Sequence, residues 1–259
     1  MSHPFHDDIA RAVRSWYLEP APEMGYTAEP RWFGVVRGNT EADFASATVT
    51  DLADGDVGRF ADELRSSFGR RAVRVQVESA AITPSLDAAL VDDGFVRGET
   101  TTYLLHCGSL PEVSSPTGFE FDPIDAAGVP EFSRVKLQAF GSTEEAPSPA
   151  DVAHENAFRR AELNGSNGFA IGRINGDAAG IIGWYGGDDS LIFLVATRVP
   201  FRRRGLASTM ICRVRDHVQA RGGRSVLINA DVDDDPVVLY RRLGFTDEVL
   251  RHHIYELQA

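Results

Sequence analysis

Hydrophobic and polar residues alternate along the C-terminal half of the chain with the periods of helices and strands. The almost wholly apolar run SLIFLVAT, residues 190–197, is typical of a strand buried on both faces. A helix after it is indicated by apolar residues at four-residue spacing: Leu206, Met210, Val214 and Val218. Asn175-Gly176 separates two further runs and predicts a tight hairpin turn. The pattern therefore predicts strands and helices in alternation.

The same reading from residue 118 onward predicts the order β-α-α-β-β-β-α-β-α-β. Strands are expected at 119–124, 168–176, 177–187, 190–197, 224–230 and 245–257, and helices at 125–140, 148–163, 206–221 and 236–243. Ser148 followed by Pro149, and Asp235 followed by Pro236, are typical helix starts. The expected fold class is α/β, a layered mixed sheet with helices on its faces.

The pattern of the N-terminal half predicts the order β-β-α-β-α-β. The last six elements predicted for the C-terminal half have the same order. Its strands are expected at 32–38, 43–52, 72–79 and 96–106, and its helices at 58–68 and 84–95. The stretch LVDDGFVRGETTTYLL (90–105) aligns with YRRLGFTDEVLRHHIY (240–255), with both Gly-Phe pairs in register. This similarity predicts an internal repeat. The Ser-, Pro- and Gly-rich stretch between the halves predicts a linker, which divides the chain into 1–107, 108–117 and 118–259.

Composition narrows the class of protein. The chain has 259 residues, 43% of them hydrophobic, and a formal net charge of -12, which argues against a nucleic-acid partner. No run approaches the roughly 20 apolar residues of a membrane-spanning helix, and no signal peptide opens the chain, so no membrane partner is expected. Cys107 and Cys212 fit no metal or disulfide framework, and we expect a cytoplasmic protein without a metal. Lys136, the sole lysine, follows no glycine, which excludes a Walker-type phosphate loop.

The stretch RVPFRRRGLAST (198–209) places three arginines at the start of a predicted helix. The positive end of the helix dipole already lies there, so added cations are unfavourable. Uncapped backbone N–H groups at a helix start can bind an anion, and Gly205 lets a ligand approach the backbone closely. The stretch therefore indicates either an anion site or a solvated basic turn.

Two motifs resemble the GNAT superfamily of acyl-CoA-dependent N-acetyltransferases. Arg202-x-x-Gly205-x-Ala207 matches the family signature after the central strand, and LYRRLGF, with Tyr240, resembles its aromatic helix. The resemblance covers residues 118 to 257. It implies a GNAT fold with a mostly antiparallel sheet, in a tandem arrangement if the N-terminal half is a repeat.

The resemblance implies acetyl-CoA as cosubstrate and a small-molecule or peptide amine as acceptor. It assigns the pyrophosphate and pantetheine contacts to the signature loop and the strand before it: Val195, Ala196, Thr197, Arg202, Arg203, Arg204, Gly205, Leu206, Ala207 and Ser208. Asn229 is a further cofactor contact, with a strand-end turn residue as the alternative. Tyr240 is the general acid for the departing thiolate, with a core aromatic as the alternative. Pro200 stands one place later than in many members, which shifts the expected register near Thr197.

The proton acceptor is open at this stage. The candidates by position are acidic residues and a histidine, with a water relay as the alternative: Asp188, Asp189, Asp231, His154 and Glu155. In the N-terminal half, Asp51, Asp54 and Asp56 replace the arginine loop and Leu90 replaces Tyr240, so we expect a degenerate repeat without its own cofactor site. A monomer is expected, with a dimer as the alternative. A non-catalytic acyl-CoA-binding module is the alternative function.

Overall fold

A computed structural model of the chain describes residues 6–18, 27–39, 44–69, 71–106, 113–141, 146–163 and 167–258. These residues form two compact units. The first contains the described residues of Met1–Tyr103, Ala230–Val237 and Glu248–Ala259, and the second those of Leu104–Asn229 and Val238–Asp247. The units therefore differ from a linear division at 107 and 118. Of the expected linker, 113–117 carries no helix or strand and 108–112 lies outside the described residues.

The second unit has the predicted order of elements. They are β6 (Phe119–Pro123), α4 (Val129–Phe140), α5 (Pro149–Glu162), β7 (Gly168–Ile174), β8 (Asp177–Tyr185), β9 (Asp189–Thr197), α6 (Leu206–Ala220), β10 (Ser225–Asp231), α7 (Asp235–Arg242) and β11 (Phe245–Leu257). The expected cap on α5 is confirmed, because the Ser148 hydroxyl accepts a hydrogen bond from the Asp151 N–H. The β7–β8 hairpin turns at Asn175 and Gly176, both with positive φ, as predicted.

The first unit contains the remaining elements. They are α1 (His6–Leu18), β1 (Thr27–Arg31), β2 (Gly34–Asn39), β3 (Phe44–Val49), a 3-10 turn η2 (Asp54–Asp56), α2 (Val57–Phe68), β4 (Val73–Glu78), α3 (Pro84–Asp92) and β5 (Phe95–His106). Helix α1 and strand β1 are absent from the order read from the sequence. Elements β5, β10, α7 and β11 have residues in both units.

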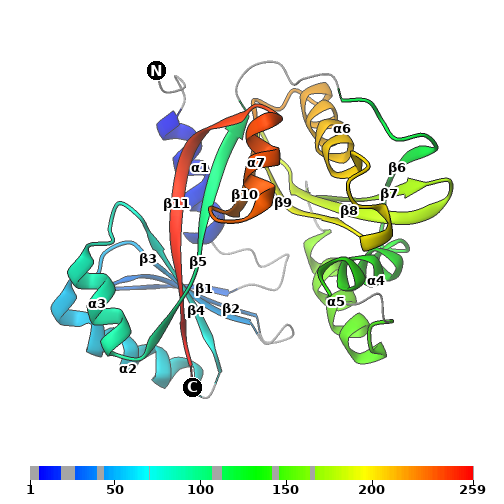
Figure 1. The fold of residues 1–259 in the computed structure, drawn as a ribbon. Coiled ribbons are helices and arrows are strands. Elements are labelled where there is room, and N and C mark those ends of the chain that lie inside the picture. Colours follow the sequence, from blue (N-terminus) through cyan, green and yellow to red (C-terminus); the bar gives the residue numbers. More distant parts are fainter. Residues whose placement is uncertain are drawn as a thin grey trace. The chain divides into compact units, whose positions relative to one another are not determined.

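The two units repeat one topology. In the first, β1 pairs with β2 and β2 with β3 in antiparallel register, and β3 pairs with β4 in parallel register. In the second, β7–β8 and β8–β9 are antiparallel and β9–β10 is parallel. The end of β11 lies between β4 and β5 in the sheet of the first unit (Figure 1). The pairing in both parts of the sheet is mixed and mostly antiparallel, which confirms the predicted fold class and repeat.

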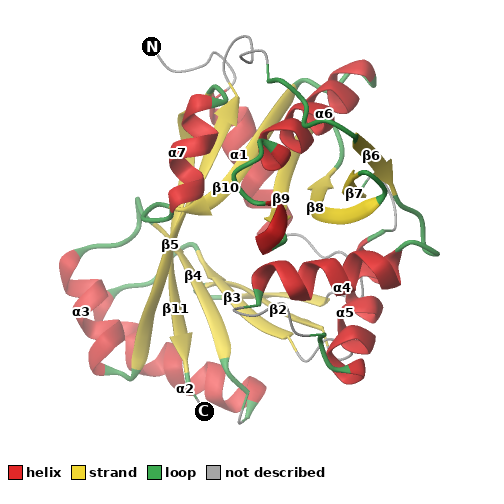
Figure 2. Ribbon diagram, turned by 45° about the vertical axis from the view of Figure 1, so that its right-hand side comes forward, coloured by secondary structure: helices red, strands yellow, loops and turns green. Residues whose placement is uncertain are grey.

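Helices cover both faces of the second unit's sheet. Figure 2 shows α6 on one face of β7, β8 and β9, and α4 and α5 on the other. The core on the α4 side includes Phe132, Phe169, Ile171 and Leu194. On the opposite face a Cβ at Gly172 would lie 2.6 Å from the sulfur of Met210, so the side chains of α6 pack directly on the backbone of β7. This close packing fixes where α6 begins.

The first unit has a separate core between its sheet and helices α2 and α3. Its large side chains include Phe33, Phe60, Leu64, Leu90 and Phe95. Val75 and Val77 of β4 face this core, so by alternation Gln76 and Glu78 face the other side of the sheet. Arg14 of α1 binds Glu78, which places α1 over that side. None of the helices in the described parts of the chain is long and apolar enough to cross a membrane.

Candidate functional site

The arginine stretch forms a loop that leads from β9 into α6. A 3-10 turn, η3 (Val199–Phe201), follows β9, and Gly205 is the N-cap of α6 with φ 81° and ψ 3°. No side chain caps this helix, so its first N–H groups face outward. Arg203 also has a positive φ, 62°, which is unusual for a residue with a Cβ. Backbone that changes hand in this way turns successive N–H groups toward one side and forms an anion-binding concavity.

Position 205 favours glycine because of its left-handed backbone conformation, and not because a side chain would clash there. The nearest atom to a Cβ added there, the Ser114 carbonyl oxygen, would lie 3.9 Å away. The left-handed backbone costs roughly 1–2 kcal/mol for a residue with a Cβ. The space above the loop is thus open to a ligand, and the loop conformation depends on Gly205.

Arg202 has a structural role that the sequence did not reveal. Its Nε donates to the Thr197 carbonyl and its Nη2 to the Ala139 carbonyl, both at 3.0 Å. The guanidinium therefore ties the end of β9 and the last turn of α4 to the loop. These two contacts turn the Arg202 guanidinium toward backbone carbonyls, and the cofactor contact that the resemblance assigns to Arg202 stays a prediction.

Arg202, Arg203 and Arg204 are all exposed, and Arg202 among them is held by its two carbonyl contacts, which leaves Arg203 and Arg204 as the cations available to a ligand. The guanidinium of Arg204 lies 5.8 Å from the ring centre of Phe201, and that of Arg198 lies 5.7 Å from the same ring. Leu206 is buried beneath the helix start, while Ala207 and Ser208 are half-buried. The loop thus combines uncapped N–H groups with two arginines available to a ligand.

Strand β9 separates from β10 before it reaches the loop. Among the described residues, the parallel pairing runs from Asp189–Ser225 to Ile192–Ile228 and ends there. Strand β9 continues to Thr197, so its edge from 193 onward is unpaired on the β10 side. Val195 and Thr197 are half-buried and Ala196 is buried. A strand edge of this kind can accept an extended ligand as an added strand.

A β-bulge marks the point where the two strands separate. Gly183 pairs with Leu194 and Trp184 pairs with Ile192, so Phe193 is an extra residue on β9. A bulge leaves the extra residue outside the hydrogen-bonding ladder and bends the strand. Asn229, on β10 one residue past the last paired position, is half-buried.

Tyr240 lies on α7, which follows β10, and only 6% of its surface is exposed. Burial alone does not distinguish a general acid from a core aromatic, so the role of Tyr240 stays a prediction. Helix α7 ends before Gly244, which has a positive φ, and Phe245 starts β11. The predicted helix-Gly-Phe motif is present as expected.

Two of the acidic candidates are held in ion pairs. Asp189 accepts from Ser225 Oγ at 2.6 Å and from Arg224. Burial raises the pKa of the Asp189 carboxyl, but these hydrogen bonds outweigh it and leave the pKa below its ordinary value. Glu155 accepts from Lys136 at 2.6 Å and from Arg159 at 2.5 Å. Both carboxylates are stabilised as anions, which makes them weak bases.

The other three candidates lie at the surface or near a turn. His154 and Asp188 are exposed. Asp231 is half-buried, and its Oδ1 accepts the Asp233 N–H at 3.2 Å, as a turn residue does.

A buried charged cluster on α5 is a feature that the sequence analysis missed. Glu162 is 2% exposed and contacts Arg159, while the Tyr185 hydroxyl donates to its Oε1 at 3.3 Å. Burial raises the pKa of Glu162 above its ordinary value, although Arg159 and Tyr185 stabilise its anion. The Tyr185 ring stacks on Phe193 at 4.2 Å, so the cluster reaches the bulge of β9. A buried carboxyl with a raised pKa, linked through Tyr185 to the end of β9 that lacks a β10 partner, is a candidate proton acceptor.

The equivalent part of the first unit lacks these features. Pairing of β3 with β4 extends to Val49, the last residue of β3, so no unpaired edge precedes α2. Asp51 and Asp54 are exposed in the following loop, as expected for a loop that repels phosphate. Leu90 is fully buried in the core. The first unit has the topology of the repeat without its anion loop.

Comparisons with known proteins agree with this architecture. Residues 169–254 match a family model described as FR47-like protein. A GCN5-related N-acetyltransferase from Kribbella flavida has a TM-score of 0.69 at 17% identity, over 97% of this chain and 96% of that one. A GCN5-related N-acetyltransferase from Sphaerobacter thermophilus has a TM-score of 0.60 at 16% identity, over 90% and 76%.

A tandem GNAT protein from the clavulanic acid biosynthesis pathway has a TM-score of 0.59 at 16% identity, over 96% of this chain and 87% of that one. No curated protein sequence matches the chain. At these identities the likeness concerns the fold. Residues 169–254 therefore form an FR47-like region, and the chain has the fold of the GCN5-related N-acetyltransferases in its tandem form.

Proposed function

We propose that the protein is an acyl-CoA-dependent N-acyltransferase that transfers an acetyl group from acetyl-CoA to an amine. The observation that carries the proposal is the unpaired end of β9, which leads directly into an uncapped helix start with a left-handed glycine. An unpaired strand edge suits the amide-containing pantetheine arm, and the helix start suits a pyrophosphate. The shared fold supports the same reading.

The loop residues fit the charge and size of the cosubstrate. The N–H groups of Leu206, Ala207 and Ser208 would bind phosphate oxygens, with Arg203 and Arg204 as charged partners. Arg202 would position this loop through its two carbonyl contacts. The backbone of Val195, Ala196 and Thr197 would pair with the pantetheine amides, and Asn229 would contact it from β10.

Bound acetyl-CoA would supply an activated acyl group as a thioester. The unpaired backbone at the β9 bulge would donate a hydrogen bond to the acyl oxygen, where negative charge develops during attack. Tyr240 would give its phenolic proton to the leaving sulfur, since a phenol with an ordinary pKa near ~10 is protonated at neutral pH.

Tyr185 and Glu162 would take the proton from the acceptor amine. An amine with a pKa near ~10 is protonated at neutral pH and must lose a proton before it can attack. The Tyr185 oxygen would accept this proton while its own proton passes to Glu162 Oε1, with which it already shares a hydrogen bond. The raised pKa of Glu162 suits it to this step.

A non-catalytic acyl-CoA-binding module is the second candidate, because the first unit shows that this fold can persist without the anion loop. Turnover separates the two. Acetyl-CoA is incubated with a panel of small and peptide amines, and release of free thiol is followed. We expect release that depends on one class of amine and is lost in Tyr240→Phe. Binding of CoA without thiol release on any amine would favour the module.

We further propose that the chain acts as a monomer in the cytoplasm, with neither nucleic acid nor membrane as a partner. One chain carries both units of the tandem fold, which supports a monomer. The acidic net charge of -12 supports the absence of a nucleic-acid partner.

A further inference from the structure

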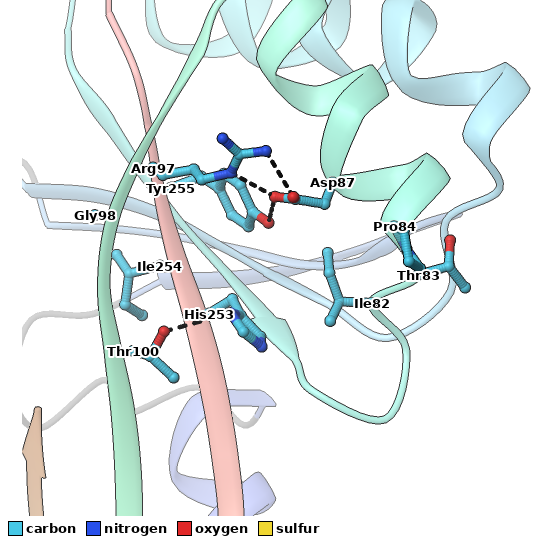
Figure 3. A pocket seen from close by; sticks show the side chains of 10 residues that line it. All are labelled: Ile82, Thr83, Pro84, Asp87, Arg97, Gly98, Thr100, His253, Ile254 and Tyr255. Atoms are coloured by element: carbon cyan, nitrogen blue, oxygen red, sulfur yellow. Dashed lines mark hydrogen bonds and ion pairs between the residues drawn. The ribbon is translucent and has the colours of Figure 1, made fainter. Parts of the chain in front are cut away.

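A hollow lies wholly within the first unit, and none of the residues that line it belongs to the proposed acyltransfer site. It has a volume of about 440 Å³, within the range of small-ligand sites. The start of α3, one edge of β5 and the last part of β11 contribute its walls (Figure 3). The polar side chains that line it are Thr83, Asp87, Arg97, Thr100, His253 and Tyr255.

Asp87 and Arg97 form the charged part of this hollow. Arg97 Nε donates to Asp87 Oδ1 at 2.7 Å, and Arg97 Nη2 donates to Oδ2 at 2.6 Å. The Tyr255 hydroxyl also donates to Oδ1, at 2.7 Å, as Figure 3 shows. Hydrogen bonds from Arg97 and then Tyr255 lower the pKa of Asp87 to about 2, so the carboxylate remains ionised.

A count of hydrogen-bonding capacity shows what this pair lacks. A carboxylate has about four acceptor positions, and Asp87 uses three of them. A guanidinium has five N–H donors; Arg97 uses two on Asp87 and also interacts with the Tyr255 side chain. The Arg97 side chain is 56% exposed, so its remaining donors are accessible. Most of the unused hydrogen-bonding positions of the pair are N–H donors, which favours an anionic ligand.

The other walls of the hollow limit the shape of that ligand. Ile82, Pro84 and Ile254 provide apolar surface. His253 lies away from the charged pair in Figure 3, with its Nδ1 at 3.4 Å from the Thr100 hydroxyl. Burial lowers the pKa of His253, which keeps its ring neutral at neutral pH. The only formal charges facing the hollow among the described residues are thus those of Asp87 and Arg97.

We propose that this hollow binds a small organic acid, with its carboxylate on Arg97 and a short apolar chain against Ile82 and Ile254. Arg97 can bind a carboxylate through its free N–H groups while its hydrogen bonds to Asp87 persist. A cationic ligand is disfavoured, because Asp87 is already neutralised and Arg97 repels it. The apolar walls favour an organic acid over inorganic phosphate. This site is independent of acyl transfer.

The test uses the full chain and four probes at pH 7. Calorimetry or ligand-observed NMR measures binding of pentanoate, pentylamine, pentanol and inorganic phosphate. Pentanoate should bind most tightly, and Arg97→Gln should weaken it at least ~10-fold, the loss of one charged hydrogen bond. The matched control is Arg74→Gln, because Arg74 is also exposed and paired with an acid, Glu99, yet does not line the hollow.

Retained pentanoate binding in Arg74→Gln, with loss in Arg97→Gln, supports the site. Circular dichroism checks that both variants fold, which the exposure of Arg97 predicts. Three results overturn the proposal: no pentanoate binding to the natural chain, equal affinity in Arg97→Gln, or pentylamine or phosphate bound as tightly as pentanoate. None of these results depends on acetyl-CoA turnover.

Discussion

Replacing Arg202 should destabilise the fold, whereas replacing its neighbour Arg204 should weaken ligand binding instead. The guanidinium of Arg202 donates to the carbonyls of Thr197 and Ala139, so Arg202→Ala leaves two acceptors without this partner. Arg204 is exposed, and its guanidinium lies 5.8 Å from the Phe201 ring centre. The two variants remove the same charge from positions only two residues apart.

The expected loss for Arg202→Ala is about 2 kcal/mol of unfolding free energy. A hydrogen bond from a charged donor contributes ~1.5–3 kcal/mol when it is shielded from water, and the bond to Thr197 is exposed while that to Ala139 is partly buried. The partly buried bond therefore dominates. For a chain of this size ~2 kcal/mol lowers Tm by roughly 4–8 °C.

Thermal unfolding followed by circular dichroism measures this effect. Arg204→Ala should lower Tm by less than about 3 °C, since an exposed cation–π contact is worth ~0.5–1 kcal/mol. The same variant should weaken CoA binding about 10-fold through loss of a phosphate contact. A Tm for Arg202→Ala within 1 °C of the natural protein would refute the structural role of Arg202.

Three further variants test the chemistry and the fold. Tyr240→Phe should lower turnover by ~10²-fold or more with CoA affinity nearly unchanged, and unchanged turnover would return Tyr240 to a core role. Glu162→Gln should lower kcat/KM by at least ~10²-fold and remove the rise in rate with pH as the raised pKa of Glu162 is passed; a retained rise would contradict its role. Burial lowers the pKa of His252 to about 4, so the unfolded chain binds more protons between pH 4 and 6.5. The free energy of unfolding, measured in urea, should therefore fall by up to about 3 kcal/mol between pH 7 and pH 4. In His252→Gln this decrease should be smaller. Equal pH dependence in both proteins would show that His252 does not cause it.

The second unit could be predicted almost completely from periodicity, whereas the prediction for the first unit lacked helix α1 and strand β1. Strand β1 reads TAEPR, with a proline and two charges and no alternation, yet it pairs with β2 at the sheet edge. An edge strand tolerates proline because one side of its backbone is unpaired. Helix α1 does carry a signal, since Ile9 and Val13 are both buried at four-residue spacing.

The candidate site was only partly visible in the sequence. The signature located the loop, but the carbonyl of Ala139 lies 63 residues from Arg202, and no local pattern reports such a contact. Glu155, Arg159 and Glu162 share one helix face by spacing, as a solvated charged face would. Only the packing of α5 shows that this face is buried. The end of β11 pairs with β4 of the first unit, and no local sequence pattern predicts this long-range pairing either.

Calorimetric titration of CoA against the full chain tests the central claim most directly, with Gly205→Glu as the comparison. The natural protein should bind one CoA per chain, since β3 pairs with β4 up to its last residue and so has no unpaired end like that of β9. Gly205→Glu adds negative charge at the anion loop and a Cβ at a left-handed position, so it should abolish binding while circular dichroism remains native. Two sites per chain, no CoA binding to the natural protein, or equal affinity in Gly205→Glu would contradict the account.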